Sequence, residues 1–486
     1  MDLPAGFTDP ITLPEVRNAV LVAIGFATVI GLAELWRRIK QPPVEWTRKL
    51  VHFGGGGLCL ILPLVINSFW IVLVLAVGMC GLFVVSKKKG WLQSIHGVER
   101  ASHGTEFYPV VILLLFLLSG DQYWQFVICV LVLAVSDSAA ALIGIRFGKF
   151  RFTVEEEQKS IEGSLAFFIV TFLVVLVPLL IWQPVGMPVS GSAMSDVSGD
   201  SLSVVNSTVR VRYLLTACLL GLLVTCMEVV SLRGTDNLWV PLGTWLVLTK
   251  TFQTDVADLM IQNGSFITIL VCLLTISKTS DLLNVGGALV CCLAAYGLWA
   301  MGSLDWAIVF FIAFSFYLAV AWWAERPWQI RVRAAAYSLI PPMLVLAVAN
   351  IFLNNSRVDI YQQLFGPFLA ASCVSLGQAA SNLASWKFRK QQAARYSIAG
   401  LTTLVVTLTV VLTSMFRQSC FEWLDLWLLC LVSCLVVAVS VYLLPTLPPG
   451  DAPKRWLRFR AGFSVLAAVA ILIFQQAGWC MCWLPQ

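Results

Sequence analysis

Residues 124–182 read WQFVICVLVLAVSDSAAALIGIRFGKFRFTVEEEQKSIEGSLAFFIVTFLVVLVPLLIW, two long apolar runs on either side of a short charged segment, residues 146–162. Each run is long enough for a helix of about 20 residues, the length that crosses a bilayer. The runs lack the alternation of a barrel strand, and a helix satisfies its own backbone hydrogen bonds in lipid. The stretch therefore predicts two membrane-spanning helices joined by a short extramembrane connection.

The same pattern extends along the whole chain. Of its 486 residues, 59% are hydrophobic and 12% are charged, and a water-soluble globule of that composition would expose very large apolar patches. We therefore expect an all-α fold, a polytopic transmembrane helical bundle of about 15 spans. The first span, near residues 17–36, follows no early basic cluster and is expected to be retained rather than cleaved as a signal peptide.

The net charge of +6 reflects the topology of the chain. Basic residues gather in short connections, at residues 37–52, 86–106, 146–162 and 233–237. The positive-inside rule places these connections in the cytoplasm, or in the stroma of a plastid. We expect an integral multi-pass protein of a bacterial inner membrane, or of an endoplasmic reticulum or plastid membrane, surrounded by membrane lipids and without a nucleic-acid partner.

Two further segments bear on the organisation of the chain. Residues 183–208 are rich in Ser, Gly, Val and Pro, and we expect a flexible extramembrane loop there. The apolar segment 252–279 is broken by charged residues. We expect two membrane domains, residues 1–250 and 251–486.

An aspartate stands in the first apolar run of the quoted stretch. We expect Asp137 at or near the cytoplasmic end of its helix, on a stripe of small residues formed with Ala140, Ala141, Gly144 and Gly148. Such a stripe lets another helix approach closely, so packing alone would explain the small residues. Packing does not explain Asp137, because an ionisable residue in a transmembrane segment is costly in free energy and usually functional.

The second apolar run begins directly after four residues of chemical interest, Lys159, Ser160, Glu162 and Gly163. A helix N-terminus with an adjacent lysine can hold a phosphate group, and Glu162 together with Asp137 could hold magnesium. The alternative is a solvated loop in which Ser160 only caps the helix. We adopt the solvated-loop interpretation for the glutamates at 155–157; for Lys159 and Glu162 we reject it because of the resemblance described below.

Two other basic connections carry polar residues in a pattern. In EWTRKLVHFGGGG, residues 45–57, four side chains have the spacing i, i+3, i+4 and i+7 and would share one helical face: Glu45, Arg48, Lys49 and His52. In MEVVSLRGTDNLWVPL, residues 227–242, Glu228 lies in a span, and Asp236 and Asn237 open the next one. A membrane-buried carboxylate is also typical of ion or proton transport, so a transporter is the rival interpretation.

Taken together, these segments resemble the prenol kinase family, which includes dolichol kinase, phytol kinase and the CTP-dependent diacylglycerol kinase and is related to the CDP-diacylglycerol synthases. The family has an acid followed by Ala and Gly, a Gly-Lys pair and then Lys-Ser-x-Glu-Gly-Ser. This chain matches at Asp137, Gly144, Gly148, Lys149, Lys159, Ser160, Glu162, Gly163 and Ser164. Three further family elements match at Arg48, Lys49 and His52, at Gly104, Tyr108 and Pro109, and at Asp236, Asn237 and Pro241. One departure is Ser136, where the family has glycine.

The resemblance implies a kinase that transfers the γ-phosphoryl group of CTP, or of another nucleoside triphosphate, to a lipid alcohol such as phytol, dolichol or another polyprenol. It implies Mg²⁺ or Mn²⁺ on the triphosphate, with Asp137, Glu162 and Asp236 as metal ligands. The implied catalytic residues are Asp137, Lys159 and Glu162. The implied nucleotide and phosphate ligands are Arg48, Lys49, His52, Gly144, Gly148, Lys149, Ser160, Gly163 and Asn237. Asp137 is either a metal ligand or the acceptor of the alcohol proton, and a CDP-lipid-forming cytidylyltransferase is the enzymatic alternative.

The second half of the chain weakly resembles the family of the chloroplast phytyl-phosphate kinase. The similarity rests on Gly286, Gly287, Ala288, Gly297, Trp306 and Phe311. Where that family has carboxylates, this chain has Gln378, Ser381 and Asn382. Because carboxylates are the usual ligands of magnesium, we expect a noncatalytic, degenerate kinase-like or substrate-guiding domain rather than a second kinase.

Overall fold

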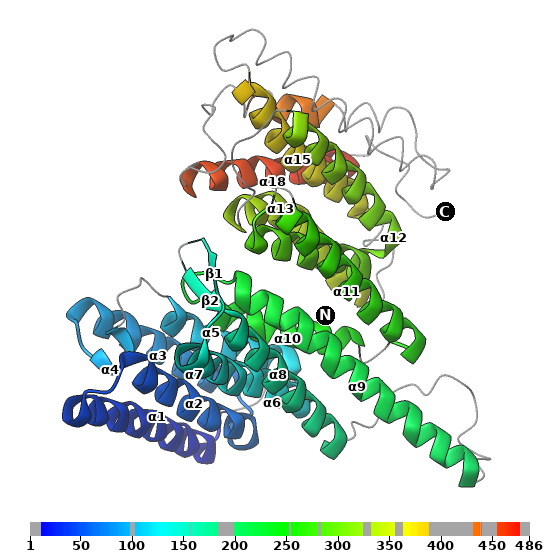
Figure 1. Cartoon of the computed structure of the whole chain (residues 1–486). Helices are drawn as coiled ribbons and strands as arrows, with labels where there is room; N and C mark the ends of the chain where they lie inside the picture. Colours follow the sequence, from blue (N-terminus) through cyan, green and yellow to red (C-terminus); the bar gives the residue numbers. More distant parts are fainter. Residues whose placement is uncertain are drawn as a thin grey trace. The chain divides into compact units, whose positions relative to one another are not determined.

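The computed structural model describes residues 11–97, 103–155, 157–182, 199–251, 254–279, 283–323, 332–354, 363–387, 431–437, 439 and 454–476. These residues are almost entirely helical (Figure 1), which confirms the all-α polytopic fold. Within the described ranges, nine helices are long and apolar enough to cross a bilayer: Leu13–Lys40, Val44–Val65, Phe69–Lys89, Tyr123–Phe147, Ile161–Trp182, Ser207–Val230, Val256–Thr279, Val285–Gly302 and Val332–Asn350. The expected total of about 15 spans also concerns residues outside these ranges and stays a prediction.

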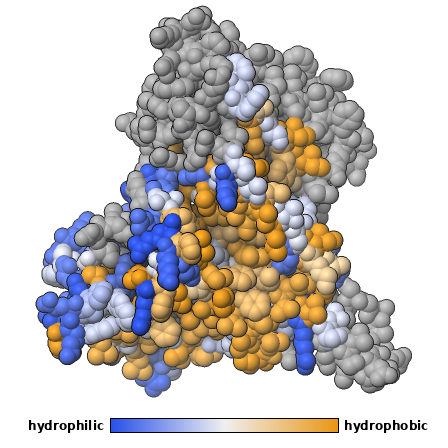
Figure 2. Space-filling model, viewed as in Figure 1, coloured by the Kyte–Doolittle hydropathy of each residue, from blue (hydrophilic) through white to orange (hydrophobic). Residues whose placement is uncertain are grey.

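The outer surface agrees with a lipid environment. Figure 2 shows hydrophobic side chains over much of the visible face of the described helices. Large apolar residues are widely exposed, among them Leu64 at 64%, Val74 at 71% and Ile181 at 73%. An apolar surface of this extent is unfavourable in water and suits contact with lipid tails. The orientation of the connections across the membrane stays a prediction.

The chain divides into two compact units, Met1–Gly264 and Ser265–Gln486. The division falls within α11 (Val256–Thr279), whereas the boundary expected after residue 250 coincides with the end of α10 (Asp236–Thr251). The other helices of the first unit are α1 (Leu13–Lys40), α2 (Val44–Val65), α3 (Phe69–Lys89), α4 (Gln93–His96), α5 (Gly104–Ser119), α6 (Tyr123–Leu131), η1 (Val132–Ser136), α7 (Asp137–Phe147), α8 (Ile161–Trp182) and α9 (Gly199–Val230).

Local sequence explains how α1 begins and where it is anchored. Thr12 and Glu15 form a capping box that satisfies backbone N–H groups of the first turn. The Glu15 carboxylate also accepts hydrogen bonds from the backbone N–H groups of Asn67, at 2.9 Å, and Ser68, at 3.1 Å. The start of α1 is thereby tied to the turn between α2 and α3.

The helix that contains Asp137 continues past it. Segments α6, η1 and α7 run without a break from Tyr123 to Phe147, and η1 is a π-helical segment directly before Asp137. Asp137 therefore lies inside the helix. The expectation that it lies at or near the end of the helix is wrong. Such π-helical insertions are frequent at functional sites.

The charged connection after α7 is a β-hairpin rather than an irregular polar loop. Strands β1 (Arg151–Val154) and β2 (Glu157–Ser160) pair antiparallel, with Phe152 opposite Lys159. The aromatic and β-branched residues of β1 favour a strand, a signal that the charges of β2 hide. The hairpin fixes the position of Lys159 immediately before α8.

The sequence predicted a loop at residues 183–208, and this prediction is wrong for the last part of the segment. Helix α9 begins at Gly199, so residues 199–208 are helical, and residues 183–198 lie outside the described residues. The Ser-rich composition of this segment indicated a loop, but it continues directly into the apolar part of α9.

The second unit has a core of its own. It is built from α12 (Val285–Trp323), α13 (Val332–Asn354), α15 (Phe365–Lys387) and α18 (Lys454–Gln476). The Trp306 ring lies 4.6 Å from that of Phe368 and 5.1 Å from that of Phe365, measured between centroids. Gly297 faces Met343, whose Cε would lie 2.8 Å from an added Cβ. Two of the residues behind the weak resemblance, Gly297 and Trp306, thus serve packing.

Candidate functional site

A polar cavity of about 450 Å³ lies within the first unit. Segments far apart in the sequence contribute to its wall, namely α2, α7, the hairpin, the start of α8, the end of α9 and the start of α10. The lining residues are Glu45, Arg48, Lys49, Asp137, Ala140, Ala141, Gly144, Ile145, Arg151, Gln158, Lys159, Ser160, Gly163, Ser164, Glu228 and Asp236. The cavity thus unites three of the segments that the sequence pattern singled out.

The first feature of this cavity is a buried ion pair between α2 and α7. Lys49 Nζ donates a hydrogen bond to Asp137 Oδ2 at 2.5 Å, and the two residues are 7% and 8% exposed. His52 Nε2 lies 3.2 Å from the same carboxylate oxygen and 2.7 Å from the carbonyl oxygen of Leu133 in η1. One carboxylate therefore holds two side chains from one face of α2.

A glycine brings α2 close enough for these contacts. A Cβ on Gly56 would overlap Ala134 Cβ of η1. Part of the glycine run at residues 54–57 is thus required for the approach of the two helices, in agreement with the role of small residues in membrane-helix packing.

The second feature is an ion pair between the hairpin and α9. Lys159 Nζ lies 2.5 Å from Glu228 Oε1 and 3.3 Å from the backbone oxygen of the same residue. Burial alone would lower the pKa of Lys159, but the nearby carboxylates of Glu228 and Asp236 raise it above its usual value. Lys159 therefore stays protonated at neutral pH and presents a permanent positive charge to the cavity.

Helices α7 and α8 meet at the stripe of small residues, as the sequence predicted. A Cβ on Gly163 would lie 3.1 Å from the backbone oxygen of Ala140 and 3.3 Å from Gly144 Cα. Ser160 Oγ accepts a hydrogen bond from the Gly163 N–H at 3.1 Å. Ser160 is therefore a helix cap as well as a residue of the cavity wall.

This contact gives a first prediction. Gly163→Ala should destabilise the protein by about 1–3 kcal/mol, because the added methyl group would enter a packed contact, 2.9 Å from Ser160 Oγ. Thermal unfolding of the purified protein in detergent measures the effect. The matched control is Gly81→Ala in α3, where nothing lies within 4 Å of an added Cβ. Equal unfolding temperatures for the two variants would contradict the close packing.

Five residues of the predicted site do not line the cavity: His52, Gly148, Lys149, Glu162 and Asn237. The Glu162 carboxylate accepts hydrogen bonds from the backbone N–H groups of Lys149, at 2.9 Å, and Phe150, at 3.1 Å. It thereby fixes the connection between α7 and the hairpin. The Lys149 side chain is exposed, and neither Glu162 nor Lys149 lines the cavity. The geometry gives no support to Glu162 as a metal ligand together with Asp137.

Other predicted residues hold helices together beside the cavity. Asn237 Nδ2 donates to the backbone oxygen of Gly104 at 2.8 Å and so joins the starts of α10 and α5. The Tyr108 hydroxyl donates to the backbone oxygen of His52 at 3.3 Å, and the two rings meet edge to face at 4.9 Å. We interpret Asn237, Gly104 and Tyr108 as positioning residues.

The structure also adds residues that the sequence did not single out. Arg151 and Gln158 of the hairpin line the cavity. The Glu157 carboxylate accepts a hydrogen bond from the backbone N–H of Arg233 at 2.7 Å, so the solvated-loop interpretation is wrong for this glutamate. In a strand, successive side chains point to opposite faces. Interpreting residues 151–160 as strands would have indicated which side chains of this segment share a face.

The cavity offers oxygen ligands for a metal that accompanies a substrate. Among the described residues, no three His, Cys, Asp or Glu side chains gather closely enough to hold a metal ion by themselves. Asp137 and Glu228 are engaged by lysines, whereas the part of the chain described shows no hydrogen bond or ion pair of the Asp236 carboxylate. Magnesium is typically held by one or two carboxylates together with phosphate oxygens and water. These residues fit magnesium that binds with a nucleotide.

Comparison with known proteins identifies relatives for about half of the chain. It is 33% identical over 242 residues to the phytol kinase of Synechocystis sp. (strain ATCC 27184 / PCC 6803 / Kazusa), an alignment that covers 49% of this chain and 93% of the relative. It is 28% identical over 245 residues to a probable chloroplastic phytol kinase of Glycine max, covering 47% of this chain and 74% of the relative. No family model matches the chain, and no solved structure does.

Proposed function

The chain belongs to the phytol kinase family, and from this premise we propose that its first unit transfers the γ-phosphoryl group of CTP, or of another nucleoside triphosphate, to a lipid alcohol such as phytol, dolichol or another polyprenol. One observation carries the proposal. The Lys49–Asp137 and Lys159–Glu228 ion pairs line the same cavity. Such a cavity offers both positive charge for phosphates and carboxylates for a metal or a proton.

Phosphoryl transfer needs mainly positioning and neutralisation of charge. Four cations line the cavity and suit a triphosphate: Arg48, Lys49, Arg151 and Lys159. The first turn of α8 also borders the cavity, and a helix N-terminus favours a bound anion. Binding of a triphosphate would exchange the Lys49–Asp137 and Lys159–Glu228 contacts in part for lysine–phosphate contacts, which would release carboxylate oxygens at the reacting group.

The carboxylates divide into two roles. We assign Asp236 to the magnesium of the bound nucleotide, because Asp236 lines the cavity and its carboxylate makes no hydrogen bond or ion pair among the described residues. Magnesium, when bound, supplies further charge neutralisation on the phosphate oxygens. Asp137 is either a second metal ligand or the group that accepts the proton of the lipid hydroxyl.

The position of the radioactive label in the nucleotide tests this function. Purified protein is incubated with magnesium, a panel of lipid alcohols or of the corresponding lipid monophosphates, and CTP, UTP or ATP labelled in either the α- or the γ-phosphate. The kinase places γ-label in the lipid alcohol and releases the nucleoside diphosphate, whereas a CDP-lipid-forming cytidylyltransferase places α-label in the lipid monophosphate and releases γ-label as pyrophosphate. Absence of label from every lipid would contradict both enzymes and favour transport.

The metal assignment gives a second prediction. Asp236→Asn should raise the magnesium concentration needed for half-maximal activity by about 10- to 100-fold, the range seen when a partner of a metal site is lost. Activity measured across a magnesium titration gives the value. Asp121→Asn, which alters an exposed carboxylate in the turn between α5 and α6, is the matched control. An unchanged magnesium requirement in Asp236→Asn would exclude Asp236 as the ligand.

A further inference from the structure

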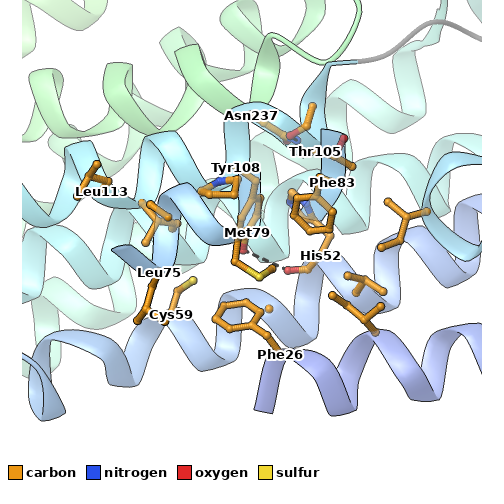
Figure 3. A pocket seen from close by; sticks show the side chains of 18 of the residues that line it. Phe26, His52, Cys59, Leu75, Met79, Phe83, Thr105, Tyr108, Leu113 and Asn237 are labelled. Atoms are coloured by element: carbon orange, nitrogen blue, oxygen red, sulfur yellow. Dashed lines mark hydrogen bonds between the residues drawn. The ribbon is translucent and has the colours of Figure 1, made fainter. Parts of the chain in front are cut away.

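A second, apolar pocket lies beside the polar cavity within the first unit, between α1, α2, α3 and α5. Phe26, Cys59, Leu75 and Met79 surround its interior, and Thr105 and Asn237 lie together on one side (Figure 3). Five lining residues of α2 recur every three or four positions, at Arg48, His52, Gly55, Cys59 and Leu62. They form one helical face that extends about 21 Å along the axis at 1.5 Å per residue.

The two spaces meet at the first turns of α2. Arg48 lines both of them. His52 lines the apolar pocket, and its Nε2 lies 3.2 Å from the carboxylate of Asp137 in the polar cavity. Polar groups are thus concentrated where the apolar pocket adjoins the phosphate-binding residues, and the remainder of its wall is almost wholly apolar.

We propose that the apolar pocket holds the hydrocarbon chain of the lipid alcohol, with the hydroxyl group at Arg48 and His52 facing Asp137. This inference rests on the proposed function. It commits to one occupant, a single isoprenoid chain, because the pocket adjoins the polar cavity at one junction, formed by Arg48 and His52.

The pocket acts through orientation rather than through affinity. Lipid tails are as apolar as the pocket wall, so a chain that leaves the bilayer for the pocket gains little from the hydrophobic effect. Its hydroxyl group, however, becomes fixed next to the phosphate-binding residues, and such positioning lowers the barrier of a bimolecular step. The pocket therefore determines which alcohols react.

Helix α1 provides the route of entry. Ala23 and Phe26 line the pocket from α1, and Ala23 is exposed on the outer surface of this candidate span. A chain can enter sideways from the membrane past these two residues, without passing through water.

Substitutions at this entrance test the inference. Ala23→Trp should reduce the rate with phytol, relative to the rate with the short alcohols prenol and geraniol, by at least about tenfold, a typical effect of steric mismatch in an apolar pocket. Phe26→Ala should shift the preference toward bulkier chains. The matched control is Ala27→Trp, one turn further along α1, which is also exposed but does not line the pocket.

The outcomes separate this inference from the function on which it rests. A wild-type protein that phosphorylates none of prenol, geraniol, farnesol and phytol contradicts the proposed function itself. An active wild type whose relative rates across this series are the same in Ala23→Trp, Phe26→Ala and Ala27→Trp overturns the pocket assignment alone. Loss of phytol turnover confined to Ala23→Trp, with prenol turnover retained, supports it.

Discussion

Replacing Asp137 by asparagine should abolish phosphoryl transfer to lipid alcohols while the protein remains in the membrane. The substitution keeps the size of the side chain but removes the charge that holds Lys49 and contacts His52. It removes either a metal ligand or the acceptor of the alcohol proton. We expect a fall in turnover of at least about 10²- to 10³-fold, the cost of losing one preorganised electrostatic group. Initial rates with the purified variant measure it.

The same substitution has an expected cost in stability that must be separated from its effect on catalysis. Asp137→Asn leaves the buried ammonium group of Lys49 without its partner, which typically costs about 3–5 kcal/mol. The double variant Lys49→Met/Asp137→Asn removes the unpaired charge and should regain stability without regaining activity. Asp121→Asn is the control for an exposed carboxylate. Wild-type turnover in folded Asp137→Asn would contradict the role of Asp137.

The second large effect is expected for Lys159→Met. Lys159 supplies a permanent cation directly before α8 and pairs with Glu228 across the cavity. Its loss removes a phosphate ligand and should reduce phosphoryl transfer by about 10²- to 10³-fold, with a raised KM for the nucleotide. Steady-state kinetics at varied nucleotide concentration separate the two contributions.

A compensated variant again distinguishes chemistry from folding. Lys159→Met/Glu228→Gln removes the carboxylate that would otherwise be left buried without a cation, and it should fold better than Lys159→Met while remaining inactive. Lys88→Met at the exposed end of α3 serves as the control for loss of a basic residue. An unchanged nucleotide KM in Lys159→Met would exclude a contact between Lys159 and the triphosphate.

Local patterns predicted much of the fold around the site. The apolar runs on either side of the connection at residues 146–162 predicted two spans, and the small residues after Asp137 predicted the close contact of α7 with α8. The exact position of Asp137 in its helix was not predictable, because the π-helical segment η1 depends on packing against neighbouring elements and has no signature in composition. The hairpin was missed because charges dominate β2.

The contacts of the site were less accessible to sequence reasoning than its residues. Lys49 and Asp137 are 88 positions apart, and Lys159 and Glu228 are 69 positions apart. The residue types, and their order in the family motifs, indicate which side chains belong to the site. They do not show which of these side chains form ion pairs with each other. For Glu162, the family motif predicted a residue of the site that the structure places outside the cavity lining. It matches the family motif, yet its carboxylate binds the backbone of the preceding connection instead of lining the cavity.

A direct comparison of two proteins shows whether the cavity between Asp137 and Lys159 transfers a phosphoryl group to a lipid alcohol. Purified wild-type protein and Asp137→Asn are incubated side by side with γ-labelled CTP, magnesium and phytol, and the label in the extracted lipid is counted over time. We predict labelled lipid phosphate from the wild type and none above background from the variant. Equal labelling by both proteins would contradict the role of Asp137, and no labelled lipid from the wild type with any alcohol or nucleotide would contradict the kinase function.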